Sequence, residues 1–305
     1  MKVTIVGAGN VGAVTAQRIY GLELAQEVVL VDVVDGIAPG KALDMFESGP
    51  LVGSDSRLVG TNNYADTAGS DIVVITAGLS RRPGMTRDDL MAKNASIVRD
   101  VTRQIVQYSP DSILIAVSSP LDEMTWVVLE ASGFERHRVI GMAGVLDSAR
   151  LRTFIAQELD VSVEDVSGIV LGSHNNMVPL IRYATVAGIP VSQWMSEEKI
   201  AAIVARTKDA GTEIVNLLKT VSAFYAPSAA IAATIEAIAR DKRRILPCAV
   251  RLDGEYGQNN VVMGVPVKLG RRGVEKIVEI DLIEDEYTLF QQAAQAVREN
   301  IAKLS

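Results

Sequence analysis

The 305-residue sequence predicts an α/β protein in which a doubly wound parallel sheet is followed by a second, α+β domain. Short runs rich in Val and Ile alternate with longer helical patterns, at residues 3–6, 28–31, 72–76 and 113–117. Strands buried on both faces have such runs, and their alternation with helices is typical of parallel βαβ units. A glycine-rich turn follows the first run, and the pattern changes beyond residue 147.

The second half is expected to be built from longer elements. Its helical patterns cover residues 148–158, 196–218, 226–239 and 284–303, and its strand-like runs cover residues 245–252 and 261–269. In the first half, the helix expected at residues 87–108 ends just before Pro110, which is a common helix stop. No linker separates the halves, so the change of pattern alone predicts one domain at residues 1–146 and another at 147–305.

Composition restricts the classes of partner and site. The chain is 48% hydrophobic and 22% charged, with a net charge of −7, so it has no general attraction for nucleic acid or anionic lipid. No apolar run reaches the ~20 residues of a membrane-spanning helix. Cys248 is the only cysteine, which excludes an intrachain disulfide and a cysteine-based zinc site. We expect a cytoplasmic protein without a structural metal.

The turn after the first strand has the sequence Gly7-Ala8-Gly9-Asn10-Val11-Gly12 and opens a helical pattern. Its three glycines allow a tight turn, a close approach of the backbone to a pyrophosphate, and packing of helix on strand. The free N–H groups at the start of the helix attract phosphate. This glycine pattern alone is weak, because a strand-to-helix turn can carry it for purely structural reasons.

Asp32 strengthens the interpretation. It stands at the end of the second strand, twenty residues after Gly12, where a carboxylate can accept hydrogen bonds from both ribose hydroxyls of adenosine. The same carboxylate would repel a 2′-phosphate, so the sequence favours NAD over NADP. Together the strand, turn, helix and acid predict a Rossmann-type dinucleotide-binding domain.

Two histidines are available as acid/base groups. His137 lies in a charged stretch, Glu135-Arg136-His137-Arg138, and is interpreted as a solvated loop residue. His174 follows a Val/Ile/Leu run and precedes small polar residues, as expected at a strand end that opens on a cleft. Its position alone leaves two readings open, a catalytic base or a structural histidine with satisfied hydrogen bonds.

Five further stretches carry a family resemblance. They are residues 40–44 (GKALD), 60–64 (GTNNY), 81–87 (RRPGMTR), 141–150 (GMAGVLDSAR) and 264–267 (GVPV). In this order, and with the glycine turn and Asp32, they resemble the lactate/malate dehydrogenase family over nearly the whole chain. Within that family they are similar to the malate dehydrogenases that are lactate dehydrogenase-like in sequence. The resemblance implies NAD-dependent, reversible hydride transfer between malate and oxaloacetate.

The resemblance also implies catalytic roles for His174, Asp147 and Arg87, and a substrate-binding role for Arg150. His174 would accept and donate the proton of the substrate hydroxyl, and Asp147 would hold the other ring nitrogen. Arg150 would bind the C1 carboxylate by a two-pronged hydrogen bond, and Arg87 would polarise the C2 carbonyl. Without the resemblance, both arginines would be interpreted as surface or helix-end cations.

Substrate choice and the remaining contacts are implied in the same way. Arg81 occupies the place where the family's malate enzymes bind the distal carboxylate, so a dicarboxylate is expected to be preferred over lactate. The alternative is that Arg81 and Arg82 are solvated loop charges. Asn94 and Ser119 would contact the cofactor, and Ser119 the substrate as well. A homo-oligomer, either a dimer or a tetramer, is expected.

The sequence departs from the family at two places. Ser119 stands where the family has an asparagine, and serine has a shorter reach with one donor instead of two. After His174 the family has Gly-Asp and one further residue before Met-Val-Pro, whereas only Asn175 and Asn176 intervene here. These changes leave two alternatives, a dehydrogenase for a different 2-hydroxy acid and a non-catalytic NAD-binding relative.

Overall fold

The computed structural model describes residues 1–79 and 86–304. Arg81 and Arg82, which bear on substrate choice, lie outside these ranges. The first half is built on six parallel strands: β1 (Lys2–Val6), β2 (Glu27–Val31), β3 (Arg57–Thr61), β4 (Ile72–Ile75), β5 (Ile113–Ala116) and β6 (Val139–Gly141). Their order in the sheet is β3-β2-β1-β4-β5-β6, with every neighbouring pair parallel.

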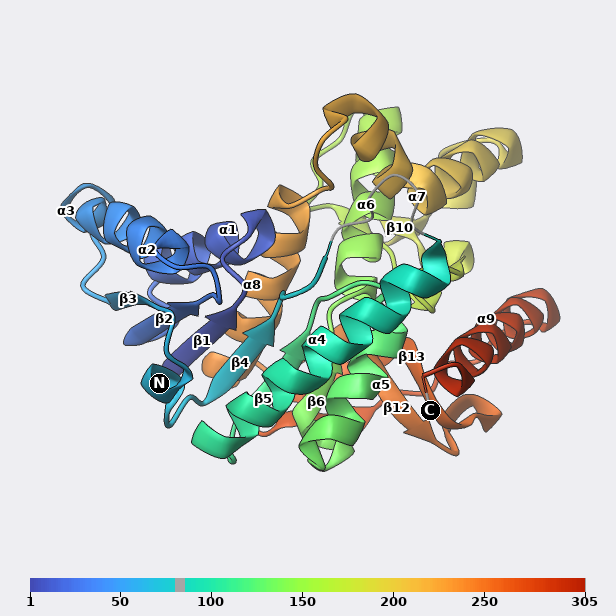
Figure 1. Cartoon of the computed structure of the whole chain (residues 1–305). Coiled ribbons are helices and arrows are strands. Elements are labelled where there is room, and N and C mark those ends of the chain that lie inside the picture. Colours follow the sequence, from blue (N-terminus) through green and yellow to red (C-terminus); the bar gives the residue numbers. More distant parts are fainter. Residues whose placement is uncertain (80–85, 305) are drawn as a thin grey trace.

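Helices cover both faces of this sheet because alternate residues of a strand point to opposite sides. Ile5 and Val74 belong to the core that packs under α1 (Asn10–Gly21), whereas Val73 and Ile75 pack under α4 (Arg87–Tyr108) and α5 (Leu121–Ser132). The helices of this half are α1 (Asn10–Gly21), α2 (Ile37–Glu47), α3 (Gly49–Val52), α4 (Arg87–Tyr108) and α5 (Leu121–Ser132). Figure 1 shows α4 running alongside β4 and β5. A capping box of Thr86 and Asp89 starts α4.

The second half continues the same sheet with antiparallel strands. Its elements are α6 (Gly144–Leu159), β7 (Val166–Ser167), β8 (Val170–Gly172), β9 (Met177–Pro179), β10 (Thr185–Val186), β11 (Ile189–Pro190), α7 (Glu197–Leu218), α8 (Tyr225–Ala239), β12 (Arg244–Asp253), β13 (Asn259–Gly270), β14 (Gly273–Ile277) and α9 (Glu284–Ala302). β12 pairs with β6 at Ala249 and Gly141, and β13 pairs with β8 at Gly264 and Gly172. Glycines at these crossings let the strands approach closely, since a Cβ at Gly264 would meet the carbonyl oxygen of Gly172 at 2.6 Å.

The predicted fold class is confirmed, a Rossmann-type first half with an α/β second half. Two details differ from the expectation. β3 carried no strand signal in the sequence, because Gly60 interrupts its apolar pattern. The structure requires this glycine, since a Cβ at Gly60 would meet the carbonyl oxygen of Ala38 at 2.1 Å. The helix expected from residue 148 begins at Gly144, which places Asp147 in its first turn. Within residues 1–79 and 86–304, no helix has both the length and the apolarity needed to cross a membrane.

Candidate active site and cofactor turn

The three glycines of the first turn have different reasons to be glycine. Gly7 has a φ of +104°, and a Cβ at Gly12 would lie 1.8 Å from the carbonyl oxygen of Gly7, so the chain itself requires both. A Cβ at Gly9 would meet nothing within 4 Å. Gly9 is also the N-cap of α1 and supplies no side-chain cap to the first N–H groups. The turn therefore leaves open space in front of uncapped donors, as an anionic ligand requires.

Asp32 lies beside this turn. One carboxylate oxygen accepts a hydrogen bond from the N–H of Ala8 at 2.6 Å and the other from that of Val34 at 2.9 Å. Lys41 donates to the carbonyl oxygen of Ala8 at 2.7 Å and so braces the turn from the other side. Asp32 is half-buried, and the residues that follow it are exposed. Glycine turn, helix start and carboxylate together fit the pyrophosphate and adenosine ribose of NAD.

The second constellation comes from two distant elements. His174 follows β8, and its Nδ1 lies 3.0 Å from Oδ2 of Asp147 in the first turn of α6. Arg150 follows one helical turn later, with Nη1 3.5 Å from the other oxygen of Asp147. The Asp147 side chain is only 2% exposed and that of Arg150 10%, whereas His174 retains 30%. A buried carboxylate thus connects a guanidinium with a partly accessible imidazole.

Electrostatics favour a protonated His174. Burial by itself lowers the pKa of His174, but the charge and hydrogen bond of Asp147, helped by the charge of Asp122, outweigh it and raise the pKa above its usual value. Burial lowers the pKa of Arg150, against the opposing charge of Asp147. Nε of Arg150 is buried without a hydrogen-bond partner among the described residues. A donor left unpaired in this way favours an anionic ligand.

The shortened loop after His174 forms a tight hairpin connection. β8 and β9 pair from Gly172 to Met177, so residues 173–176 alone make the turn. The N–H of Asn176 is held by Oγ and the carbonyl oxygen of Ser173, at 3.0 and 3.2 Å. The loop keeps the imidazole in hydrogen-bond contact with Asp147 despite the missing residue.

Asn94 and Ser119 are brought together beside the ends of β4 and β5. The Asn94 side chain is buried, accepts from the N–H of Leu79 at 2.7 Å and donates to the carbonyl oxygen of Ser119 at 2.7 Å. Its amide joins the two loops that follow these strands. Ser119 itself is exposed.

Arg87 makes no contact with the histidine cluster among the described residues. It is the first residue of α4 and is exposed. No contact within the described parts of the chain joins it to His174, Asp147 or Arg150. Its role in polarising the C2 carbonyl of the substrate therefore stays a prediction.

Two further carboxylates lie at the site and were missed by the sequence analysis. Asp122 and Glu123, in the first turn of α5, are each only 1% exposed. Oδ2 of Asp122 accepts the backbone N–H of His174 at 2.8 Å, and Oε1 of Glu123 accepts from Asn300 of α9 at 2.6 Å. An acid in the first turn of a helix is usually explained by its favourable interaction with the helix dipole, so the sequence gave no reason to expect these two to be buried. Across the described ranges, no three His, Cys, Asp or Glu side chains are grouped to hold a metal ion.

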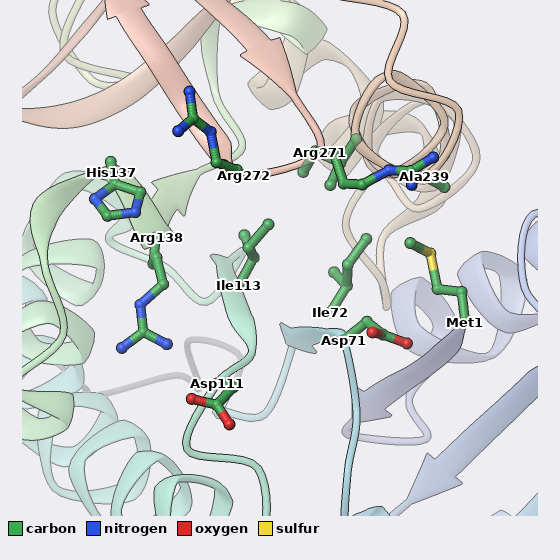
Figure 2. A pocket seen from close by; sticks show the side chains of 11 residues that line it. Met1, Asp71, Ile72, Asp111, Ile113, His137, Arg138, Ala239, Arg271 and Arg272 are labelled. Carbon is green, nitrogen blue, oxygen red and sulfur yellow. The ribbon is translucent and has the colours of Figure 1, made fainter.

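A separate cavity of about 580 Å³ lies at the opposite ends of the parallel strands (Figure 2). Asp71 and Asp111 line it just before β4 and β5, and His137 and Arg138 also line it, with Arg138 near Asp111. His137 is 40% exposed and its Nδ1 lies 3.2 Å from Glu135. Ligands of parallel α/β sheets bind at the carboxyl ends of the strands, so this edge lies away from the predicted site.

Comparisons with known proteins agree with this geometry. The family model for the lactate/malate dehydrogenase NAD binding domain matches residues 1–141, and the model for the family's alpha/beta C-terminal domain matches residues 144–305. A malate dehydrogenase of Chlorobium luteolum is 57% identical over 305 residues, covering 100% of this chain and 98% of the relative.

Solved structures extend the likeness to both branches of the family. The malate dehydrogenase of Salinibacter ruber has a TM-score of 0.96 and 54% identity, covering 100% of this chain and 97% of that one. A lactate dehydrogenase of Cryptosporidium parvum, solved with lactic acid and nicotinamide adenine dinucleotide, has a TM-score of 0.96 at 39% identity, covering 99% and 97%. The chain therefore belongs to the lactate/malate dehydrogenase family and carries that family's NAD-binding domain.

Proposed function

We propose that this protein catalyses the reversible, NAD-dependent oxidation of malate to oxaloacetate. The observation that carries the proposal is the 3.0 Å contact between His174 Nδ1 and buried Asp147, with Arg150 one helical turn further on. Oxidation of a 2-hydroxy acid removes a hydride from C2 and a proton from the C2 hydroxyl. When bound, NAD supplies the acceptor for the hydride.

His174 would take the proton. With its Nδ1–H donating to Asp147, Nε2 is the ring nitrogen left to exchange a proton with the substrate. The negative charge of Asp147 stabilises the imidazolium that forms. In the reverse direction the raised pKa of His174 keeps the proton available for oxaloacetate reduction.

Arg150 would hold the C1 carboxylate. Its guanidinium is largely buried and its Nε lacks a partner in the described structure, so a carboxylate could supply a two-pronged partner. Binding one end of the substrate in this way fixes C2 relative to His174. Arg87 is proposed to stabilise the negative charge that develops on the C2 oxygen.

The NAD site is proposed at the glycine turn. The N–H groups at the start of α1 would face the pyrophosphate, with Gly7, Asn10, Val11 and Gly12 shaping the turn, and Gly9 leaving room for it. Asp32 would accept the ribose hydroxyls. Asn94 donates a hydrogen bond to the carbonyl oxygen of Ser119, so we propose that Asn94 supports this part of the cofactor site and that Ser119 would contact cofactor and substrate.

The preference for malate rests on sequence and on relatives. The relatives at 57% and 56% identity are named malate dehydrogenase, and Arg81 is the residue proposed to bind the distal carboxylate. The likeness to a lactate dehydrogenase at the same TM-score means that the backbone alone does not separate the two substrates. A cation enclosed with the substrate disfavours lactate, which would leave that charge unpaired.

A single assay tests these points. NADH oxidation is measured with oxaloacetate, pyruvate and other 2-oxo acids, and again with NADPH. We expect oxaloacetate to react at least ~100-fold faster than pyruvate in kcat/KM, because the unpaired charge costs a few kcal/mol. A preference for another 2-oxo acid would replace malate in the proposal, and no turnover with any of them would contradict the enzymatic function.

The proposal includes a cytoplasmic homo-oligomer. Cys248 is buried and is the only cysteine, which suits a reducing compartment. Large apolar side chains are exposed along α2 and α3, namely Ile37, Leu43, Phe46, Leu51 and Val52. Such a surface suits contact with a second copy of the chain. Light scattering should give a dimer or tetramer that Leu43→Glu weakens, and a monomeric wild type would contradict this part.

A further inference from the structure

Resting on the proposed function, we infer that Asp122 is a positioning residue for His174: as a carboxylate it anchors the histidine backbone and sustains the protonated imidazole. No residue pattern pointed to this role, because Asp122 and His174 are 52 positions apart in the sequence. His174 is thereby held by two carboxylates, one at its backbone and one at its ring.

The anchor is a direct hydrogen bond. Oδ2 of Asp122 accepts the N–H of His174 at 2.8 Å, within the range of a charge-assisted bond. The bond fixes the second residue of the four-residue connection between β8 and β9. At the other end of that connection Ser173 holds the N–H of Asn176. Hydrogen bonds at His174 and at Asn176 therefore hold a loop that is one residue shorter than the family pattern.

The carboxylate is also placed to act through its charge. Oδ1 of Asp122 is buried without a hydrogen-bond partner among the described residues, so its charge is poorly screened. The groups that face Asp122 are Glu123 beside it on α5, Asp147 on α6 and His174 itself. Of these only His174 can carry a positive charge. Around His174 stand Asp122, Asp147 and Arg150.

The titration of Asp122 agrees with this role. Burial, joined by the charge of Glu123, raises the pKa of Asp122 to about 7, while the hydrogen bond from His174 acts in the opposite direction. Asp122 becomes negative as the pH rises through neutrality, which is where an ordinary histidine loses its proton. The Asp122 carboxylate thus becomes negative in the pH range in which an ordinary imidazolium would lose its proton.

A solvated acid at the start of a helix would look different. Such a residue normally has a lowered pKa, because the helix dipole favours its charged form. Asp122 is buried, and its charged form is disfavoured. Its bond with the N–H of His174, at 2.8 Å, is what links this buried acid to the histidine.

The test reads the ring of His174 directly. The chain has two histidines, so a His137→Gln background in protein without a histidine tag leaves a single imidazole signal for NMR titration. We expect Asp122→Asn to lower the pKa of that ring by about one unit, the effect of losing one nearby opposite charge. Asp160→Asn is the matched control, since Asp160 ends the same helix that carries Asp147, is exposed, and has a φ of 54° that asparagine tolerates.

A second variant keeps the test valid if Asp122→Asn folds poorly. Glu123→Gln removes the charge that hinders ionisation of Asp122, so it should move the pKa of His174 upward, opposite to Asp122→Asn. The alkaline limb of kcat/KM for oxaloacetate reduction should shift in the same directions. If the ring pKa is unchanged in both variants, the inference is wrong. If the ring pKa shifts while wild type turns over no 2-oxo acid, the proposed function is wrong and the positioning of His174 by Asp122 stands.

Discussion

The glycine turn and the histidine cluster use opposite physical means. The turn between β1 and α1 works through backbone groups within six consecutive residues, and its side chains matter mainly where they are missing, at Gly7, Gly9 and Gly12. The cluster around His174 works through buried side chains brought from α5, α6 and the β8–β9 connection. The function of the turn therefore depends on open space around its backbone, and that of the cluster depends on the charges of its side chains.

This difference sets what each region tolerates. A backbone site has few charges to desolvate, so it costs little stability, but a single added methyl group can block it. The cluster collects Asp122, Glu123 and Asp147 around one imidazole and one guanidinium, and burying carboxylates destabilises the folded state. Substitutions in the turn should thus act through steric clashes. Substitutions in the cluster should act through charge, so their effects on activity and stability should depend on pH.

The largest expected effect is on chemistry in the cluster. His174→Ala should lower kcat for oxaloacetate reduction by about a thousandfold, because the proton donor is lost. NADH binding, followed by fluorescence, should stay close to wild type since the glycine turn is untouched. His137→Ala serves as the control and should retain full activity. Substantial turnover in His174→Ala would show that another group moves the proton.

Next comes a matched pair in the turn. Gly12→Ala places a methyl group 1.8 Å from the carbonyl oxygen of Gly7, so it should lower the free energy of unfolding by about 3 kcal/mol. Gly9→Ala meets no protein atom within 4 Å and should leave stability within about 0.5 kcal/mol. It should nevertheless weaken NADH binding at least ~10-fold, because the close approach of the pyrophosphate is blocked. Unimpaired binding by Gly9→Ala would contradict a phosphate site at this turn.

The cost of charge in the cluster gives a third prediction. The folded pKa of Asp122, about 7, lies above its unfolded value of 3.8, so its contribution to stability is complete below pH ~4 and is lost as the pH rises through 7. The free energy of unfolding of Asp122→Asn, relative to wild type, should therefore rise by about 2 kcal/mol between pH 5 and pH 8. Urea unfolding at a fixed protein concentration measures this. The same difference from wild type at both pH values would mean that Asp122 does not titrate in this range.

The smallest effect concerns cofactor choice. Asp32→Ala should weaken NADH binding about tenfold, the loss expected for one charge-assisted contact with the ribose. It should also reduce the discrimination against NADPH, since no carboxylate repels the 2′-phosphate. Fluorescence titrations with both cofactors give the ratio of affinities. If the ratio of affinities equals that of wild type, Asp32 does not select the cofactor and only supports the turn through its hydrogen bond with the N–H of Ala8.

Local patterns predicted the parts of the molecule that depend on neighbouring residues. The runs at β1, β2, β4 and β5, the glycine turn and the helix α4 all follow from spacing within a short window. The fold class, the family and NAD as cofactor are confirmed. The pairing of His174 with Asp147 came from the family resemblance, and the structure brings the two to 3.0 Å. The catalytic roles remain predictions.

The sequence could not predict what depends on distant contacts. Asp122 and Glu123 follow Pro120 at a helix start, where acids are common and usually exposed. Their burial depends on His174 and on Asn300, which lies 177 positions from Glu123. The absence of a strand signal at β3 has the same origin, since Gly60 is required by its contact with Ala38.

The pairing of Ala249 in β12 with Gly141 in β6 makes one continuous sheet of the two halves. A hinge between the halves would have to break that ladder and expose the apolar residues packed beneath it. This continuous sheet therefore opposes large domain rotation as a means of enclosing substrate. Any gating of the reaction falls to loops at the rim of the sheet, and turnover should depend on solvent viscosity only through those short segments.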